Sequence, residues 1–266
     1  MIRSRRRQRE SRTLGTTPGV VCNICSAPIS DPATVLHREE PSCPVCRSNV
    51  RFRSVIAALS LHFHGVSLAL EDFPSRPELV GVGMSDWEGY AVRLRRSFGY
   101  DNTYFDEQTR LDIMAPVPHA LASSCDFVVS SDVLEHVVPP YQSALRHVRE
   151  MLKPGGLLVL TVPMRSMPAT DEHFPDLHQW DVVMLGSERV LVNRTATGEL
   201  QVFGNLVYHG GPGVTLEMRV FGRSELVAAL GAAGFVNVRE FDRPIPEHGI
   251  EWIEDCTWPI LAEVPR

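Results

Sequence analysis

Two Cys-x-x-Cys pairs near the amino terminus constrain the fold of this chain most strongly. Cys22 and Cys25 form the first pair, Cys43 and Cys46 form the second, and seventeen residues separate the pairs. Four thiolates at this spacing can surround one zinc ion as in a zinc ribbon, and they leave no coordination position open. The spacing therefore predicts a structural zinc site in a small module over residues 20–54. Thiol redox chemistry is the weaker alternative, because neither pair has a thioredoxin-like context.

Length and composition predict one large domain with this small module attached. The chain has 266 residues and 44% hydrophobic residues, which suffices for a globular core. No apolar run reaches the roughly 18 residues of a membrane span, and the basic start lacks the apolar stretch of a secretory signal. Four of the six cysteines are paired like metal ligands, which suits a reducing compartment. We therefore expect a soluble, cytoplasmic protein that does not bind membranes.

The amino-terminal segment is strongly basic, although the formal net charge of the chain is −6. Its first twelve residues include six arginines. The composition of residues 1–19 predicts a disordered, solvated tail, and the alternative is an arm that contacts phosphates. Without this tail the remaining chain is still more acidic, which argues against a broad nucleic-acid-binding face.

Strand and helix patterns alternate from residue 78 onward. Glu78–Gly83 and Leu157–Val162 are short apolar runs, as expected for buried strands, and Tyr141–Leu152 has the apolar spacing of an amphipathic helix. This repeated order predicts an α/β fold, a Rossmann-like, doubly wound sheet over residues 78–266. Residues 55–77 are predicted to begin with a helix that links the module to this domain.

Residues 164–221 interrupt the alternation. Arg189–Arg194 and Glu199–Phe203 flank Thr195–Gly198 as the two strands of a hairpin flank their turn. The pattern predicts a small β-rich cap inserted into the sheet domain.

The run from Asp126 to Pro163 resembles class I S-adenosylmethionine-dependent methyltransferases. The matching pieces are Phe127–His136, the helix that follows, and Leu152–Gly156 (Leu-Lys-Pro-Gly-Gly) ahead of a strand. The resemblance implies that S-adenosylmethionine binds beyond the carboxyl ends of the strands, near the change in strand order. It also implies a methyl acceptor bound beside the cofactor.

The resemblance further implies a glycine turn after the first strand and polar side chains after the later ones. Asp112 would lie at the adenine side, at the end of the third strand, and Asp106 or Glu107 would bind the ribose. Alternatively, Asp112 caps a turn and Asp132 caps a short helix. Two positions depart from the usual pattern, because Leu79 replaces an acidic residue and Ser85 a third glycine. The expected cofactor-binding residues are Gly81, Gly83, Ser85, Asp86, Asp112, Ser130, Ser131 and Asp132.

Histidines of the insert are the candidate general bases or acceptor-orienting groups. His173 and His178 lie in the acidic segment 171–178, which follows the fifth strand, and His209 lies further along the insert. Each could instead be an ordinary loop histidine, and their spacing is too loose to predict a metal site. His136 resembles a position that is usually structural in the family, and a role as base is its lesser alternative.

Three arginines follow the second cysteine pair. Arg47, Arg51 and Arg53 could face an anionic substrate, or they could form a solvated surface. Some rRNA guanine methyltransferases carry an amino-terminal zinc module, so the resemblance also leaves RNA open as a substrate.

We therefore predict a methyltransferase that uses S-adenosylmethionine and carries a structural zinc ion. The expected acceptor is a small metabolite, natural-product intermediate, sugar or peptide, methylated on oxygen or nitrogen. One alternative is an RNA methyltransferase that binds RNA through the zinc module and the arginine-rich tail. The other is a non-catalytic binding protein, which Leu79 supports best.

Overall fold

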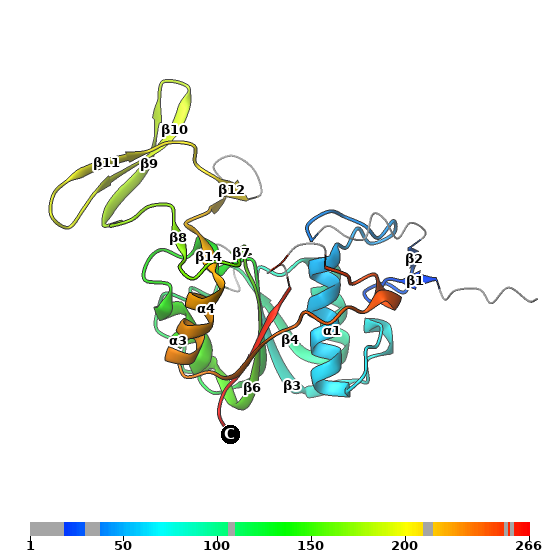
Figure 1. Ribbon diagram of the computed structural model, residues 1–266. Helices are drawn as coiled ribbons and strands as arrows, with labels where there is room; N and C mark the ends of the chain where they lie inside the picture. The colour runs from blue at the N-terminus through cyan, green and yellow to red at the C-terminus, as the bar shows by residue number, and fades with distance from the viewer. Residues whose placement is uncertain (1–18, 30–37, 106–109, 210–214, 253–254, 256–257) are drawn as a thin grey trace, which may run out of the picture.

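A six-stranded mixed sheet forms the centre of the computed structural model, which describes residues 19–29, 38–105, 110–209, 215–252, 255 and 258–266 (Figure 1). The four parallel strands were expected from the sequence, and two antiparallel strands extend the sheet at one edge. The doubly wound, Rossmann-like architecture is thereby confirmed. In spatial order the strands are β15 (Val236–Glu240), β16 (Ile260–Glu263), β6 (Leu152–Thr161), β5 (Cys125–Ser131), β3 (Arg76–Met84) and β4 (Phe98–Thr103).

Helices cover both faces of this sheet (Figure 1). Side chains alternate between the two faces along a strand, so neighbouring residues of β5 enter different cores. Phe127 and Val129 pack into the core that includes α1 and α2, whereas Val128 packs into the core that includes α3 and α4. The bounds are α1 Val50–His64, α2 Glu88–Ser97, α3 Gln142–Met151 and α4 Arg223–Ala232.

The direction of the chain changes at the middle of the sheet. From β3 the chain passes through α2 to β4 on one side, and it later returns to β5 on the other side of β3. β3 pairs in parallel with both strands, and Met84 at its end lies opposite Thr103 and Ser130. The carboxyl ends of β3 and β5 thus meet at the switch in strand order, where open α/β sheets bind their ligands.

The amino-terminal module packs directly against the sheet domain. It contains β1 (Val20–Val21) and β2 (Pro28–Ile29), which pair as a two-stranded sheet. Ile24 of the module lies in one continuous core with α1 and with Phe127 of the sheet. The helix predicted as a linker is therefore part of the main core, and it begins at Val50, where the Asn49 side chain caps the Phe52 amide at 2.9 Å.

The insert forms a cap that projects from the carboxyl-end side of the sheet (Figure 1). The predicted hairpin is confirmed as β10 and β11, and β9 pairs on the other side of β10. The bounds are β9 Gln179–Leu185, β10 Glu188–Arg194 and β11 Leu200–Phe203. Short strands connect the cap to the body: β7 (Met164–Arg165), β8 (Asp171–Glu172), β12 (Tyr208–His209), β13 (Thr215–Leu216) and β14 (Arg219–Gly222).

Arg219 anchors the cap to the body. Its side chain is fully buried and donates to the backbone oxygens of Leu134, at 3.0 Å, and Val137, at 2.6 Å. These oxygens flank the short helix η3 (Leu134–His136); the other 3-10 helices are η2 (Leu70–Asp72) and η4 (Pro246–His248). η3 and the base of the cap are therefore fixed to each other.

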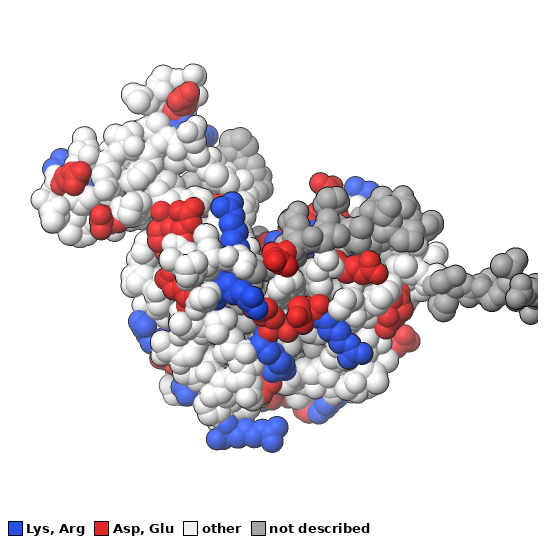
Figure 2. Space-filling view, in the orientation of Figure 1, with Lys and Arg blue, Asp and Glu red and all other residues white. Residues whose placement is uncertain are grey.

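Charged side chains are unevenly distributed on the face shown in Figure 2. Acidic and basic side chains alternate over the body, and the projecting cap is mostly uncharged. Within the described residues, no helix has both the length and the apolar character needed to cross a bilayer. The predicted basic tail lies almost entirely outside the described residues.

Candidate active site

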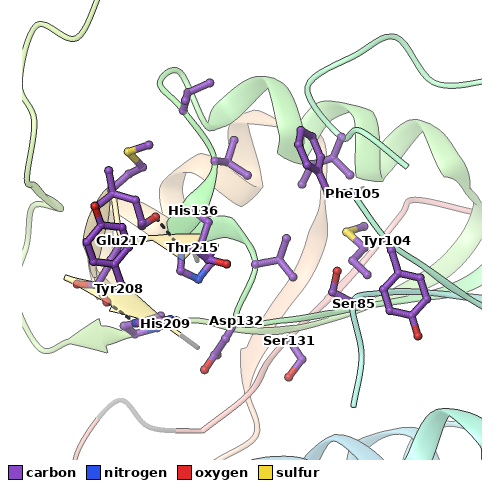
Figure 3. A pocket seen from close by; sticks show the side chains of 18 of the residues that line it. Ser85, Tyr104, Phe105, Ser131, Asp132, His136, Tyr208, His209, Thr215 and Glu217 are labelled. Carbon is purple, nitrogen blue, oxygen red and sulfur yellow. Dashed lines mark hydrogen bonds and ion pairs between the residues drawn. The ribbon is translucent and has the colours of Figure 1, made fainter. Parts of the chain in front are cut away.

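A cavity of about 1550 Å³ lies at the carboxyl ends of β3 and β5, and the module, the sheet and the cap all contribute to its walls. Single-ligand pockets usually measure roughly 300–1,000 Å³, so this one has room for a cofactor and a small acceptor together. Figure 3 shows Ser85 and Tyr104 at one end and His136, His209 and Glu217 at the other, with Ser131 and Asp132 between them. The two ends are called here the sheet end and the cap end.

The sheet end contains two of the expected cofactor residues. Ser85 follows β3 with a φ of 54°, so the turn after this strand is made by a left-handed serine. Asp112 also lines the cavity, and its Oδ1 accepts from the Met114 amide at 2.9 Å. Among residues 110–124 no strand forms, so Asp112 lies in a turn rather than at the end of a third strand. Asp106 and Glu107 lie outside the described residues.

Gly81 and Gly83 lie within β3 rather than in a turn after it. A Cβ at Gly81 would be 2.1 Å from the Phe127 ring, and a Cβ at Gly83 would be 2.0 Å from the Tyr100 hydroxyl oxygen. Side chains at these positions would collide with the core. The structure therefore gives the two glycines a packing role, and neither lines the cavity.

Asp86 is buried behind the cavity wall. Its carboxylate accepts a hydrogen bond from the Tyr100 hydroxyl, and its amide donates to Asn102 Oδ1 at 2.9 Å. Burial raises the pKa of Asp86 to about 7, although the hydrogen bond from Tyr100 opposes the shift. Ser130 is also buried and does not line the cavity, so of the predicted set only Ser85, Asp112, Ser131 and Asp132 do.

Asp132 joins the module to the floor of the cavity. Arg38 Nη2 lies 2.6 Å from its Oδ1, and Arg51 Nε lies 3.2 Å from its Oδ2. Thr161 Oγ1 donates to the same carboxylate at 2.8 Å. Burial opposes ionisation, but the two guanidinium groups hold the pKa of Asp132 well below its usual range.

Arg51 reaches further along the same floor. Its Nη1 donates to Ser131 Oγ at 2.6 Å, and its Nη2 lies 2.8 Å from Glu39 Oε2. The residues lie 80 positions apart in the first of these pairs, so the arginine-rich segment after the second cysteine pair faces the cavity rather than solvent.

The cap end of the cavity carries a cluster of histidines and acids. His136 and His209 both line the cavity, and their rings are perpendicular at 4.6 Å between centroids. His209 Nε2 lies 2.9 Å from Glu217 Oε2, and His173 Nε2 lies 3.6 Å from the other oxygen of Glu217. The acid thereby brings two of the predicted histidines together.

His178 lies apart from this cluster. It is exposed just before β9, and its backbone amide donates to Asn193 Oδ1 at 2.9 Å. It does not line the cavity. Among the three histidines predicted as bases, His209 lines the cavity and His173 contacts it through Glu217.

The four paired cysteines converge in the module. Sγ of Cys22 lies 3.7 Å from that of Cys46, and Sγ of Cys25 lies 3.6 Å from that of Cys43. All four sulfur atoms lie within 4.8 Å of one another. The predicted cluster of thiols is therefore formed, with a geometry compatible with one tetrahedral zinc ion.

Arg53 lies beside this cluster and is fully buried. It donates to Ser42 Oγ at 2.9 Å and to the Gly249 carbonyl at 3.1 Å. Burial lowers the pKa of Arg53, and the negative charge of the four thiolates would counteract this effect. A metal centre of four thiolates carries negative charge, which is the partner that a buried cation requires.

Sequence reasoning missed several residues of the cavity. Arg38 and Glu217 carry no motif, and their partners lie far away in the chain or across the insert. Glu135 looked structural, yet its carboxylate oxygen Oε1 lies 3.7 Å from nitrogens of both His136 and His209. The run of Glu135 and His136 after β5 was a signal for this cluster, but its third member could not be read from spacing.

Comparisons with known proteins agree with the fold and the cavity. The methyltransferase domain family matches residues 64–240. The chain therefore belongs to this family and is an S-adenosylmethionine-dependent methyltransferase. No curated protein sequence matches the chain.

Several solved structures are similar to the chain at low identity. The 1,6-didemethyltoxoflavin-N1-methyltransferase of Burkholderia thailandensis is 15% identical over 80% of this chain and 77% of its own, with a TM-score of 0.40. The amino pentose methyltransferase CalS10 of Micromonospora echinaspora is 16% identical over 70% and 83%, with a TM-score of 0.41. The sugar N-methyltransferase KedS8 of Streptoalloteichus sp. is 12% identical over 79% and 85%, with a TM-score of 0.45.

Proposed function

We propose that this methyltransferase acts on an oxygen or nitrogen of a small-molecule acceptor, such as a metabolite, natural-product intermediate, sugar or peptide. The observation that carries the proposal is the single cavity with two chemically different ends. The sheet end fits the cofactor, and the cap end offers an acceptor site lined by titratable side chains. An enclosed cavity and a net charge of −6 support a small acceptor over RNA.

The residues of the sheet end fit S-adenosylmethionine by their chemistry. Leu111, Ile113 and Met84 offer apolar contacts to an adenine ring, and the Asp112 carboxylate can accept from its amino group. Asp112 Oδ1 already accepts from the Met114 amide, so Oδ2 is the oxygen assigned to the ligand. Arg51 is the cation assigned to the carboxylate of the methionyl group.

When bound, the cofactor supplies a methyl group on a sulfonium, and the protein must bring an acceptor atom in line with it. Ser131 and Asp132 lie between the two ends, so they border the path along which the methyl group passes. Val137, Val138 and Met218 line the cap end and keep water away from the acceptor. Orientation of this kind supplies much of the barrier reduction in such transfers.

The His136, His209 and Glu217 group is assigned to the acceptor. Glu217 fixes the ring of His209 at 2.9 Å, and His209 faces the cavity. An acceptor hydroxyl or ammonium must lose a proton as it is methylated, and a positioned group of this type contributes about 10²–10⁴-fold.

Calorimetric titration with S-adenosylmethionine and S-adenosylhomocysteine tests the cofactor end. We expect both to bind, and Asp112→Ala to weaken binding by more than about tenfold, which corresponds to the loss of one charge-assisted hydrogen bond. Unchanged affinity in Asp112→Ala would remove this residue from the site. His209→Ala should keep cofactor affinity and lose turnover with acceptors found by screening, and equal loss of both would contradict the division into two ends.

We also propose that Cys22, Cys25, Cys43 and Cys46 hold a structural zinc ion. The convergent sulfur atoms and the buried Arg53 beside them support this assignment. With all four positions taken by thiolates, the ion would have no site for substrate and would act on stability alone. Zinc measured in purified protein, and its loss in Cys22→Ser, is the expected result.

A further inference from the structure

Three side chains at the cap end bring their ligand atoms unusually close together. Glu135 and His136 belong to η3, His209 belongs to β12, and one atom of each lies within 4.8 Å of the others. The chain brings them together over more than 70 residues because Arg219 fixes η3 to the base of the cap.

Hydrogen bonds set the proton positions on both rings. Nδ1 of His136 lies 2.8 Å from the Leu216 carbonyl oxygen, which can only accept, so Nδ1 carries the proton and Nε2 has a free lone pair. Nε2 of His209 lies 2.9 Å from Glu217 Oε2 and donates to this carboxylate, so Nδ1 has the free lone pair. Each ring therefore offers one basic nitrogen.

Both basic nitrogens face the same carboxylate oxygen. His136 Nε2 and His209 Nδ1 each lie 3.7 Å from Glu135 Oε1. This separation is too long for a hydrogen bond. Two atoms bound to one zinc ion at about 2.1 Å are about 3.4 Å apart at a tetrahedral angle, so the observed spacing fits ligands that share a metal ion.

The state of Glu135 is a second, independent observation. Its side chain is fully buried, and neither carboxylate oxygen has a hydrogen-bond partner among the described residues. A buried carboxylate without a partner is costly unless a cation satisfies it. The one polar direction open to Glu135 leads to the two histidine nitrogens.

We propose that Glu135, His136 and His209 bind a divalent first-row transition-metal ion, with zinc as the reference ion. The ligands are one carboxylate and two neutral imidazoles, and the Leu216 carbonyl and Glu217 orient the rings from outside. A set of two histidines and one carboxylate leaves a coordination position open, as in catalytic zinc sites. This position faces the cavity, because His136 and His209 both line it.

The site narrows the class of acceptor, a step that rests on the proposed function. An acceptor bound at the open position would present a hydroxyl oxygen or another metal-coordinating atom, and a divalent cation lowers the pKa of an oxygen it binds. The acceptor class is therefore a small molecule that coordinates a metal through the atom to be methylated. Metal binding itself does not require the acceptor or the cofactor.

Metal content of the full chain, purified, incubated with zinc and desalted, is the first test. We expect His136→Ala and His209→Ala each to contain one zinc ion fewer than the wild type. His178→Ala is the matched control, because His178 belongs to the same insert but is exposed and outside the cavity, and it should keep the wild-type content. Equal zinc content in all four proteins would overturn the proposal.

Cobalt titration of the wild type keeps the test decisive if the variants do not fold. After zinc has filled the four-cysteine site, added Co²⁺ should produce the weak visible bands of a nitrogen and oxygen site, without intense sulfur charge transfer. Glu217→Gln should bind Co²⁺ about 10–100-fold more weakly, as expected for an outer partner. No cobalt signal in the wild type would reject the site even where cofactor titration succeeds, and failure of cofactor binding alone would instead count against the proposed function.

Discussion

The amino-terminal module and the cap border the same cavity but differ in how they are built into the molecule. The module shares the main core: Ile24 and Arg53 are fully buried, and Arg38 and Arg51 reach the floor of the cavity. The cap has a small core of its own around Phe174 and Leu191, and its strand β9 is exposed along most of its length. The module is thus part of the folding unit, whereas the cap can change shape without disturbing the sheet.

Loss of the proposed zinc ion should break this comparison most severely. Cys43→Ser removes one ligand, and structural zinc contributes about 10–16 kcal/mol of apparent binding energy in small zinc domains. We expect the melting temperature to fall by about 10 °C or more, since one kcal/mol changes it by roughly 2–4 °C at this size. Calorimetry and zinc analysis of the same samples would measure this.

Cys125→Ser is the matched control for this experiment. Cys125 is also fully buried, but it lies in β5 and outside the cysteine cluster. Its replacement introduces a buried hydroxyl without affecting any metal ligand, at a cost of about 1–3 kcal/mol. Equal loss of stability in the two variants would contradict a metal-dependent module.

The ion pairs beneath the cavity should give the next largest effect. Asp132→Asn leaves Arg38 and Arg51 buried and close together without the carboxylate between them. Removing one partner of a buried ion pair costs about 3–5 kcal/mol. Urea unfolding at neutral pH would measure the loss, and Asp181→Asn in the exposed strand β9 should change stability by less than about 0.5 kcal/mol. Similar values for both would mean that the module is not held through Asp132.

The patterns that are local in sequence predicted the fold well, and the cavity much less. Strand and helix patterns, the cysteine pairs and the β10–β11 hairpin depend on neighbouring residues, and all of these elements are formed. The contacts of Asp132 with Arg38 span 94 positions, and those of His209 with Glu135 cross the insert. Such pairs depend on how the elements pack, which periodicity does not contain.

The glycines show the opposite problem, because a familiar pattern suggested the wrong physical reason. Gly81 and Gly83 were expected in a cofactor turn, but they lie in β3 where Phe127 and Tyr100 leave no room for a Cβ. The turn itself is made by Ser85 in a left-handed conformation. A sequence shows that a position needs glycine, but the neighbour that excludes a side chain becomes visible only in the folded protein.

Stability should depend on pH through Asp86, on the module side of the sheet. Its pKa is raised to about 7, against about 3.9 for an unfolded chain, so its contribution is present at low pH and is lost as pH rises through 7. Between these values the free energy of unfolding should fall by about 1.4 kcal/mol per pH unit. Asp86→Asn should abolish this slope, so the difference between the two proteins should change by about 2 kcal/mol from pH 5.5 to 7.5. Parallel curves would show that Asp86 ionises at its ordinary pKa.

The smallest effect is expected on the outer strand of the cap. Val202 in β11 is 55% exposed, whereas Val55 in α1 is fully buried beside the module. Val202→Ser should change the free energy of unfolding by less than about 0.5 kcal/mol, and Val55→Ser should cost about 2–4 kcal/mol because it leaves a cavity and a buried hydroxyl. Urea unfolding of the two variants would compare the regions with the same substitution. A large cost at Val202 would mean that another surface covers the cap in solution, and the cap would then belong to the folding unit as the module does.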